Sequence, residues 1–258
     1  MNEKVIEIYE NEIFQCNKCK YNNKIMNPYS DFNSKIPKER RNSYENRRKY
    51  IVDYINDKNN IKLMIIGLAP GLDGCGFSGI PFTDEYNAIE KLEYNNYHSN
   101  IKPYQCEESA KYIYKVLRNV ALVKGKTIKE ISKSIFMTNS CQCVPLETDV
   151  SIKDPSTEML NSCWGYLDSL INEIEPETII VLGGISCKNL LGRFKDINKK
   201  DFLKITDCIT KEQCFFVNDI KVIPEIHPSP RNRNNPHTKK LYEGLENRLT
   251  KYICDSIS

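Results

Sequence analysis

The chain has 258 residues, of which 28% are charged and 40% hydrophobic, a composition typical of globular rather than disordered proteins. Lys and Arg total 37 against 34 Asp and Glu, and the net charge of +3 neither demands nor excludes nucleic acid as a partner. No apolar run approaches the roughly 20 residues of a membrane-spanning helix, and the N-terminal segment MNEKVIEIYENEIF is acidic where an export signal would be basic. We therefore expect a cytoplasmic protein with no membrane partner.

The chain contains 11 cysteines. An odd number without an export signal argues against a disulfide scaffold and favours reduced thiols, some of which could bind a metal. Only Cys16 with Cys19 and Cys141 with Cys143 form close pairs. Most of the other cysteines are expected to be small buried hydrophobic residues.

Residues 20–60 are interpreted as an appended helical, basic segment of a single domain that spans residues 1–258. Within it, Lys35–Lys49 holds seven basic residues against two acidic ones. Such a run predicts either a solvated helix face or a patch that faces nucleic acid.

Four apolar segments are nearly continuous rather than alternating, as expected for strands buried on both faces of a parallel sheet. They are Ile61–Gly67, Ser134–Thr138, Thr178–Gly183 and Lys221–Ile226. Helical spacing of apolar residues occurs between them, in Ala110–Val123, Thr157–Glu175 and Ile185–Leu191. This alternation predicts an α/β fold, a three-layer α/β/α sandwich with a central four-stranded, mainly parallel sheet. Ligands of such sheets bind beyond the carboxyl ends of the strands.

The segment after the first strand is rich in glycine, with five glycines in the thirteen residues from Gly67 to Gly79. Glycines allow a backbone to approach a ligand closely. The pattern is neither a phosphate-binding P-loop nor a dinucleotide fingerprint.

Polar residues follow two other strands. Thr138-Asn139 ends the second strand, and a buried Asn offers both a donor and an acceptor to the edge of a base. The last strand leads into His227-Pro-Ser-Pro, a better place for a functional His than most. The residues that follow have donors suited to phosphate oxygens, namely Ser229, Arg231, Asn232 and Arg233.

Together these motifs resemble the uracil-DNA glycosylase superfamily, and within it the iron–sulfur branches called families four and five. The resemblance rests on GLAP followed by Gly-x-x-Phe-Thr, on Thr-Asn-x-x-x-Cys-x-Pro, and on HPSPRN. It implies an enzyme that binds DNA containing a damaged or modified base. Such an enzyme flips out uracil or another deaminated base and hydrolyses its N-glycosidic bond, leaving an abasic site. A monomer associated with the nucleoid through DNA is expected.

The resemblance also implies residue roles. Phe82 should stack on the flipped base, Asn139 should hydrogen-bond its edge, and His227 should donate to the pyrimidine O2. The backbone at Gly67, Ala69 and Gly71 should help to orient the base and the water. The stretch with Ser229, Arg231, Asn232 and Arg233 should contact the DNA backbone.

The carboxylate that positions the water is open. Family five has Ala in the first motif, here Ala69, and an Asp after Phe-Thr-Gly. In this sequence Glu85 falls on the position of that Asp and Asp84 replaces the Gly, while Asp73 is a third carboxylate in the loop. Asp73 and Glu85 rank ahead of Asp84.

Members of these branches bind a [4Fe–4S] cluster, and the matching positions are Cys16, Cys19, Cys143 and Cys163. Zinc accepts the same ligands and is the alternative metal, and Cys141 could replace Cys143. By resemblance the cluster is structural, because it pins the N-terminal segment to the core. Two further functions are kept: a glycosylase for another modified base, for example in foreign DNA, and a non-catalytic DNA-binding relative.

Overall fold

The computed structural model describes residues 1–19, 25–30, 43–94, 106–148, 151–194, 197 and 204–257. Its central sheet has the order β3-β2-β6-β8-β7. Four strands run parallel to one another, namely β2 (Leu63–Gly67), β3 (Ile135–Asn139), β6 (Thr178–Leu182) and β8 (Ile220–Glu225). The four predicted strands are therefore confirmed, with ends that shift by at most two residues.

The sheet has five strands rather than the predicted four. The additional strand, β7 (Phe215–Val217), pairs antiparallel with β8 at the edge of the sheet. A two-residue turn joins them, with positive φ at both Asn218 and Asp219, as a tight hairpin requires. The sequence analysis missed β7 because a three-residue strand is too short to show a periodic pattern.

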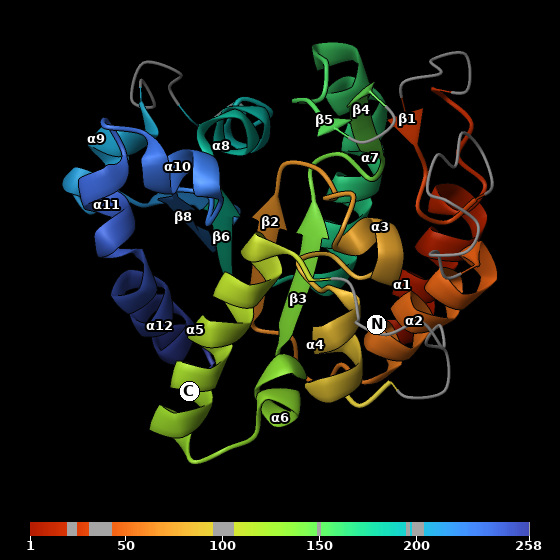
Figure 1. Cartoon of the computed structure of the whole chain (residues 1–258), viewed down its shortest axis with the longest axis horizontal. Coiled ribbons are helices and arrows are strands. Elements are labelled where there is room, and N and C mark those ends of the chain that lie inside the picture. The colour runs from red at the N-terminus through yellow and green to blue at the C-terminus, as the bar shows by residue number, and fades with distance from the viewer. Residues whose placement is uncertain are drawn as a thin grey trace.

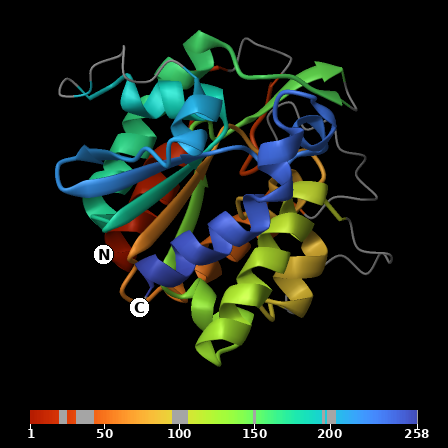
Figure 2. The same cartoon turned by 90° about the vertical axis from the view of Figure 1, so that its left-hand side faces the viewer.

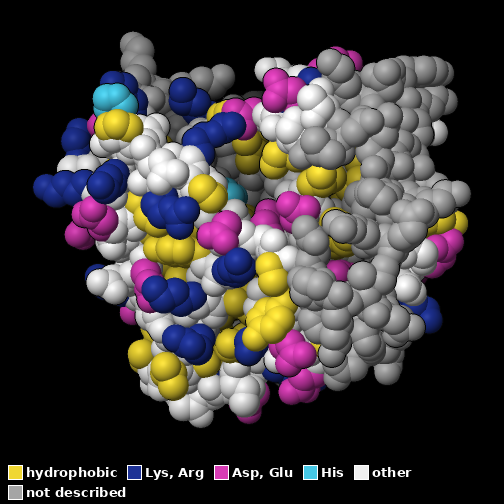
Figure 3. All heavy atoms as spheres, viewed as in Figure 1, with side chains coloured by type: hydrophobic (Ala, Val, Ile, Leu, Met, Phe, Trp, Pro, Cys, Tyr) yellow, Lys and Arg dark blue, Asp and Glu magenta, His cyan; other side chains and the backbone are white. Residues whose placement is uncertain are grey.

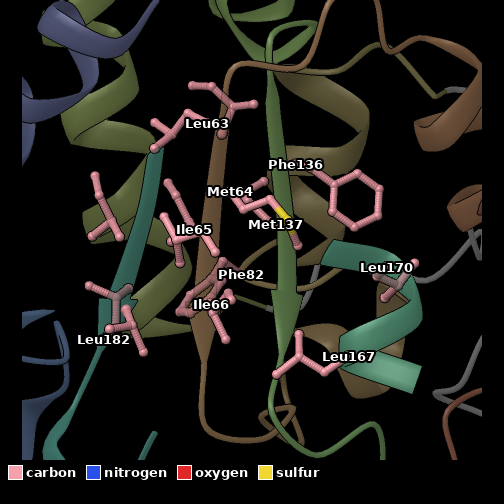
Figure 4. Close-up of a cluster of buried hydrophobic side chains, with 14 of the residues drawn as sticks. Leu63, Met64, Ile65, Ile66, Phe82, Phe136, Met137, Leu167, Leu170 and Leu182 are labelled. Atoms are coloured by element: carbon pink, nitrogen blue, oxygen red, sulfur yellow. The ribbon is translucent and has the colours of Figure 1, made fainter. Parts of the chain in front are cut away.

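Every residue of β2, β3 and β6 is buried, which explains their continuous apolar sequences. Helices cover both faces of the sheet. Figure 2 shows α5 (Glu108–Lys124) and α12 (Leu245–Ser256) on one side, and α1 (Asn2–Ile8) and α7 (Thr157–Ile174) on the other. The predicted three-layer α/β/α sandwich is confirmed. Figure 4 shows the core between the sheet and the helices, including Met64, Ile66, Phe136, Met137, Leu167 and Leu170.

Local signals set the helix boundaries. Ser156 is the N-cap of α7, and its hydroxyl accepts a hydrogen bond from Met159 N at 3.2 Å.

The remaining elements are short. The helices are α3 (Cys75–Ser78), α4 (Glu85–Glu90), α6 (Ile128–Ser132), α8 (Gly184–Leu191), α9 (Ile205–Thr210), α10 (Pro230–Asn234) and α11 (Lys239–Glu243), with a π-helical turn at Tyr9–Ile13. A small second sheet has the order β1-β4-β5, formed by Ile25–Met26, Val144–Thr148 and Ser151–Ile152. Figure 1 shows this small sheet and α10 on opposite sides of the carboxyl end of the large sheet.

Helix α2 (Tyr44–Asn56), in the predicted basic segment, contributes buried residues to the same core as the sheet. Arg47 is only 1% exposed and donates through Nε to the carbonyl of Pro28. Arg48 donates to the carbonyls of Tyr29 and Phe14, at 2.7 and 3.3 Å. Arg47 is therefore buried and faces neither solvent nor a partner, whereas Arg48 is half-buried and Lys49 is exposed. The basic residues at 35, 38, 40 and 41 lie outside the described residues.

Among the residues that the structure describes, no helix is both long enough and apolar enough to cross a bilayer.

Candidate active site

The three sequence motifs meet at one cavity beyond the carboxyl ends of β2, β3 and β8. Its volume is about 240 Å³. Its lining comes from the Gly-rich loop, the start of α5, the end of β3, the tip of β5 and the segment after β8: Ala69, Pro70, Gly71, Phe82, Glu107, Glu108, Ser109, Asn139, Ile152, His227, Ser229 and Pro230. Figure 3 shows this face of the molecule hollowed between α10 and the β4–β5 hairpin.

Gly67 allows Asn139 and Phe82 to approach each other. Gly67 pairs with Asn139 across the parallel β2–β3 ladder. A Cβ atom at Gly67 would lie 2.5 Å from Asn139 Oδ1 and 2.5 Å from Phe82 Cζ. Phe82 itself has a left-handed backbone, with φ of 55°. Such a conformation is costly for an aromatic residue and is often found at functional sites. The predicted base-binding residue Gly67 thus acts behind the cavity wall, whereas Ala69 and Gly71 are in it.

His227 lies beside Phe82, with 5.8 Å between the ring centroids. Its carbonyl oxygen accepts hydrogen bonds from Ser229 N and Asn232 Nδ2, both at 2.8 Å, which fixes the turn after β8. Burial lowers the pKa of His227 to about 4. The imidazole is therefore neutral near pH 7, with one nitrogen able to donate and the other able to accept a hydrogen bond.

An ion pair between the buried Glu225 and the partly buried Arg248 stabilises the turn that follows β8. Glu225, at the end of β8, is fully buried, and its oxygens accept from Arg248 Nε at 2.7 Å and from the Arg248 terminal nitrogen at 3.0 Å. The Glu225 carboxylate also accepts from Ile226 N at 2.8 Å, and its carbonyl accepts from Gly183 N at 2.7 Å. The pair therefore links α12, β8 and the start of α8. The sequence analysis did not identify it, because Glu225 and Arg248 meet only in the folded chain.

The three predicted water-positioning carboxylates do not line the cavity described above. Asp73 is exposed, and Glu85 is buried at the start of α4. Asp84 is fully buried as the N-cap of α4. It accepts from Asn87 N and Asn87 Nδ2, both at 2.8 Å, and from Glu107 N at 2.9 Å. Asp84 is therefore a link between α4 and the start of α5.

Two carboxylates do line the cavity, Glu107 and Glu108, and the sequence analysis missed both. A Cβ atom at Gly71 or Gly74 would lie 2.0 or 2.1 Å from a Glu107 carboxyl oxygen, so this carboxyl group lies directly against the glycine loop. Burial raises the pKa of Glu107 to about 7, and the charges of Asp84 and Asp73 add to the effect. A carboxyl group with a pKa near the working pH is suited to proton transfer. Its place three residues before the predicted helix Ala110–Val123 was the only signal in the sequence.

The four predicted DNA-contacting residues differ in position. Ser229 lies in the wall of the cavity, and Asn232 is turned inward to the His227 carbonyl. Arg231 is exposed and lies 3.4 Å from Asp154 on the opposite side of the hollow, and Arg233 lies 3.9 Å from Glu108. Arg231 and Asn232 line a second groove of about 360 Å³ that adjoins the cavity.

The predicted cluster cysteines gather near the start of α7. Burial raises the pKa of Cys143, and the thiols of Cys163, Cys16 and Cys19 raise it further, so all four are close enough to interact. A hydrogen bond with the Cys141 thiol, with 3.9 Å between the two sulfurs, lowers the pKa of Cys163. Within the described part of the chain, no three His, Cys, Asp or Glu side chains are placed to hold a single metal ion.

Comparisons with known proteins agree with this geometry. The family described as the uracil DNA glycosylase superfamily matches residues 52–249, which include all three strand-end motifs. The fold is similar to the crystal structure of wild-type Pedobacter heparinus SMUG2, with 17% identity, a TM-score of 0.51, and coverage of 90% of this chain and 86% of that one. A comparison with curated proteins gave no match. Because the family match extends over most of the chain and contains the cavity, the protein belongs to the uracil DNA glycosylase superfamily.

Proposed function

We propose that the protein is a DNA glycosylase that takes uracil or another deaminated base out of DNA and hydrolyses its N-glycosidic bond. The observation that carries this proposal is the convergence of Phe82, Asn139 and His227 on one cavity. These are an aromatic face, an amide edge and a neutral imidazole, which together match a flat base with polar edges. The match to the uracil DNA glycosylase superfamily over residues 52–249 also supports this proposal.

The chemistry requires that a base leave as an anion while the sugar gains positive charge. Phe82 would stack on the extruded base, and Asn139 would bind its amide edge. His227, which is neutral because burial lowers its pKa to about 4, would donate a hydrogen bond to the oxygen on which negative charge accumulates. Donors fixed in advance at such a position stabilise the transition state most effectively.

The attacking water needs a carboxylate, and we assign this role to Glu107 in place of Asp73, Glu85 or Asp84. Glu107 is the acidic side chain that lies both in the cavity wall and against Gly71 and Gly74. Asp84 would act indirectly, because it holds the Glu107 backbone N–H. The ionised form of Glu107 would orient the water and take its proton.

We further propose that the protein belongs to the iron–sulfur branch, with features of families five and four. The arrangement that supports this is the approach of Cys16, Cys19 and Cys163 to Cys143. In a [4Fe–4S] cluster each thiolate binds a different iron, so the ligands do not crowd around one point as they do in a zinc site. Such a cluster would supply a structural crosslink between the N-terminal segment, the β3–β4 connection and α7. Zinc on the same thiolates, and Cys141 in place of Cys143, are the alternatives.

A glycosylase for a different modified base is the second candidate. Glu107 and Glu108 give the cavity wall two carboxyl groups, which can accept hydrogen bonds from exocyclic amino or hydroxyl groups on a base. The first measurement should therefore compare the excision rates of different bases.

The proposal is tested with oligonucleotides that carry one uracil, hypoxanthine or xanthine, followed by alkaline cleavage of abasic sites. We expect strand cleavage at one or more of these bases. His227→Ala should lower the excision rate strongly, while His237→Ala, a change outside the cavity, should not. Binding of all three oligonucleotides without any excision would instead identify a non-catalytic relative.

A further inference from the structure

The rim of the cavity carries an exposed hydrophobic residue with no role in the chemistry above. Ile152, in β5, is 45% exposed. It lines both the cavity of about 240 Å³ and the adjoining groove of about 360 Å³. Among the exposed large hydrophobic residues of the described chain, Ile152 is the one found in both.

The β4–β5 hairpin holds Ile152 firmly. Ile152 pairs with Leu146, which is only 2% exposed and packs in a small hydrophobic cluster. Lys153 N donates to the carbonyl of Pro145 at 3.0 Å, and the hydroxyls of Thr148 and Ser151 lie 2.6 Å apart. These contacts fix the strand from which the Ile152 side chain is exposed.

The surroundings of Ile152 combine apolar and cationic groups. Pro230, the first residue of α10, lines both cavities with it. Lys153 and Arg231 line the same groove. The ion pair between Arg231 and Asp154 is exposed, at 74% and 49% of the two side chains, and exposed pairs contribute little, so a phosphate could replace Asp154. Apolar atoms between cations suit a nucleic-acid strand, whose bases are flat and apolar and whose phosphates are anionic.

We propose that Ile152 packs against the bases next to the extruded one and fills part of the gap that the extruded base leaves in a duplex. This rests on the proposed function, because it takes the cavity as the site of the flipped base. Extrusion costs stacking and pairing energy in a duplex, and apolar side chains inserted at a base step offset such costs in other proteins. A single strand has no comparable gap, so the contribution of Ile152 should be specific to duplex DNA.

The test compares Ile152→Ala with the unchanged protein in single-turnover excision of the same base from single-stranded and double-stranded oligonucleotides of one sequence. We expect the double-strand rate to fall about tenfold, the effect of removing a partly buried aliphatic side chain, with the single-strand rate almost unchanged. Ile152→Phe should keep the double-strand rate. Leu122→Ala, at a 74% exposed residue of α5 outside both cavities, should change neither rate.

A second measurement does not depend on catalysis. Affinity is measured for a duplex with one abasic site and for the intact duplex, and Ile152→Ala should lose most of the preference for the abasic duplex. Unchanged rates and unchanged preference would overturn the inference, as would an equal loss of rate on single and double strands. If the unchanged protein excises no base but Ile152→Ala still removes the preference, the proposed function is wrong and the inference stands.

Discussion

Replacing Glu107 by Gln tests the assignment of the water-positioning carboxylate. Gln keeps the size and polarity of the side chain but cannot take a proton. The loss of a general base at this position should lower the excision rate by about 10²- to 10⁴-fold. Because the pKa of Glu107 is raised to about 7, the residual rate of the variant should also lose its dependence on pH in this range.

The pH profile of the unchanged protein follows from the same pKa. The active form is the carboxylate, so the rate should rise with pH. About one tenth of Glu107 is ionised at pH 6 and about nine tenths at pH 8, which predicts a rise of roughly tenfold with a midpoint near 7. His227, whose pKa is about 4, stays neutral throughout and adds no second transition. Single-turnover excision rates in buffers of constant ionic strength measure this profile.

Glu108→Gln is the matched control. This neighbour is exposed and paired with Lys111 at 3.0 Å, and a hydrogen bond with Lys111 lowers its pKa. Its replacement should leave the midpoint near 7. A midpoint near 7 that persists in Glu107→Gln, or that moves in Glu108→Gln, would refute the assignment of Glu107.

The same carboxyl group affects stability with a definite sign. The pKa is higher in the folded protein, about 7, than the 4.5 of an unperturbed Glu. The folded state therefore binds more protons between these values, and the protein loses stability as pH rises from about 4.5 to 7. Above pH 7, Glu107→Gln should be more stable than the unchanged protein, by at most about 3 kcal/mol. Urea unfolding at pH 5 and pH 8 checks this difference.

Three further predictions concern the cluster and the scaffold. The purified protein should contain about four irons per chain and absorb at about 400 nm. Cys143→Ser and Cys163→Ser should lose both signals, and Cys187→Ser, at a buried residue of α8, should keep them. One equivalent of zinc without colour would contradict the iron assignment. Arg248→Met leaves the buried Glu225 carboxylate without its cation and should lower the free energy of unfolding by about 3–5 kcal/mol. The double variant Arg248→Met with Glu225→Gln should recover part of this loss. If Arg248→Met were as stable as the unchanged protein, water or another cation would have to replace Arg248. Gly79→Ala, at φ 77° with a Cβ atom 2.6 Å from the Arg47 carbonyl oxygen, should cost clearly more unfolding free energy than Gly125→Ala, at φ 62° in open space, for which about 1 kcal/mol is expected. Equal losses in thermal or urea unfolding would mean that the loop moves away from Arg47.

The sequence alone was sufficient for the three-layer architecture, the four parallel strands and the edge of the sheet at which the motifs meet, but not for β7 or the small second sheet. Strands buried on both faces must be continuously apolar, so Thr178–Gly183 and its three counterparts were recognisable without long-range information. Their carboxyl ends lie at one edge of a parallel sheet. The segments that end in Asn139 and His227 and the glycine loop were therefore bound to meet, and the cavity between them confirms this.

Only the tertiary structure decided which charged side chains reach the cavity and which are buried elsewhere. Asp73, Glu85 and Asp84 are adjacent to the motif in sequence, yet Glu107 reaches the cavity. A hydrogen bond from Glu107 N to Asp84 joins the start of α5 to α4, and the Glu107 carboxyl group lies against Gly71 and Gly74 of the glycine loop. Arg47 is basic like its neighbours, but the packing of α2 buries it against a carbonyl group. Periodicity reports which face of an element is buried, whereas the approach of two side chains from distant segments depends on the packing of whole elements, which no local pattern of residues encodes.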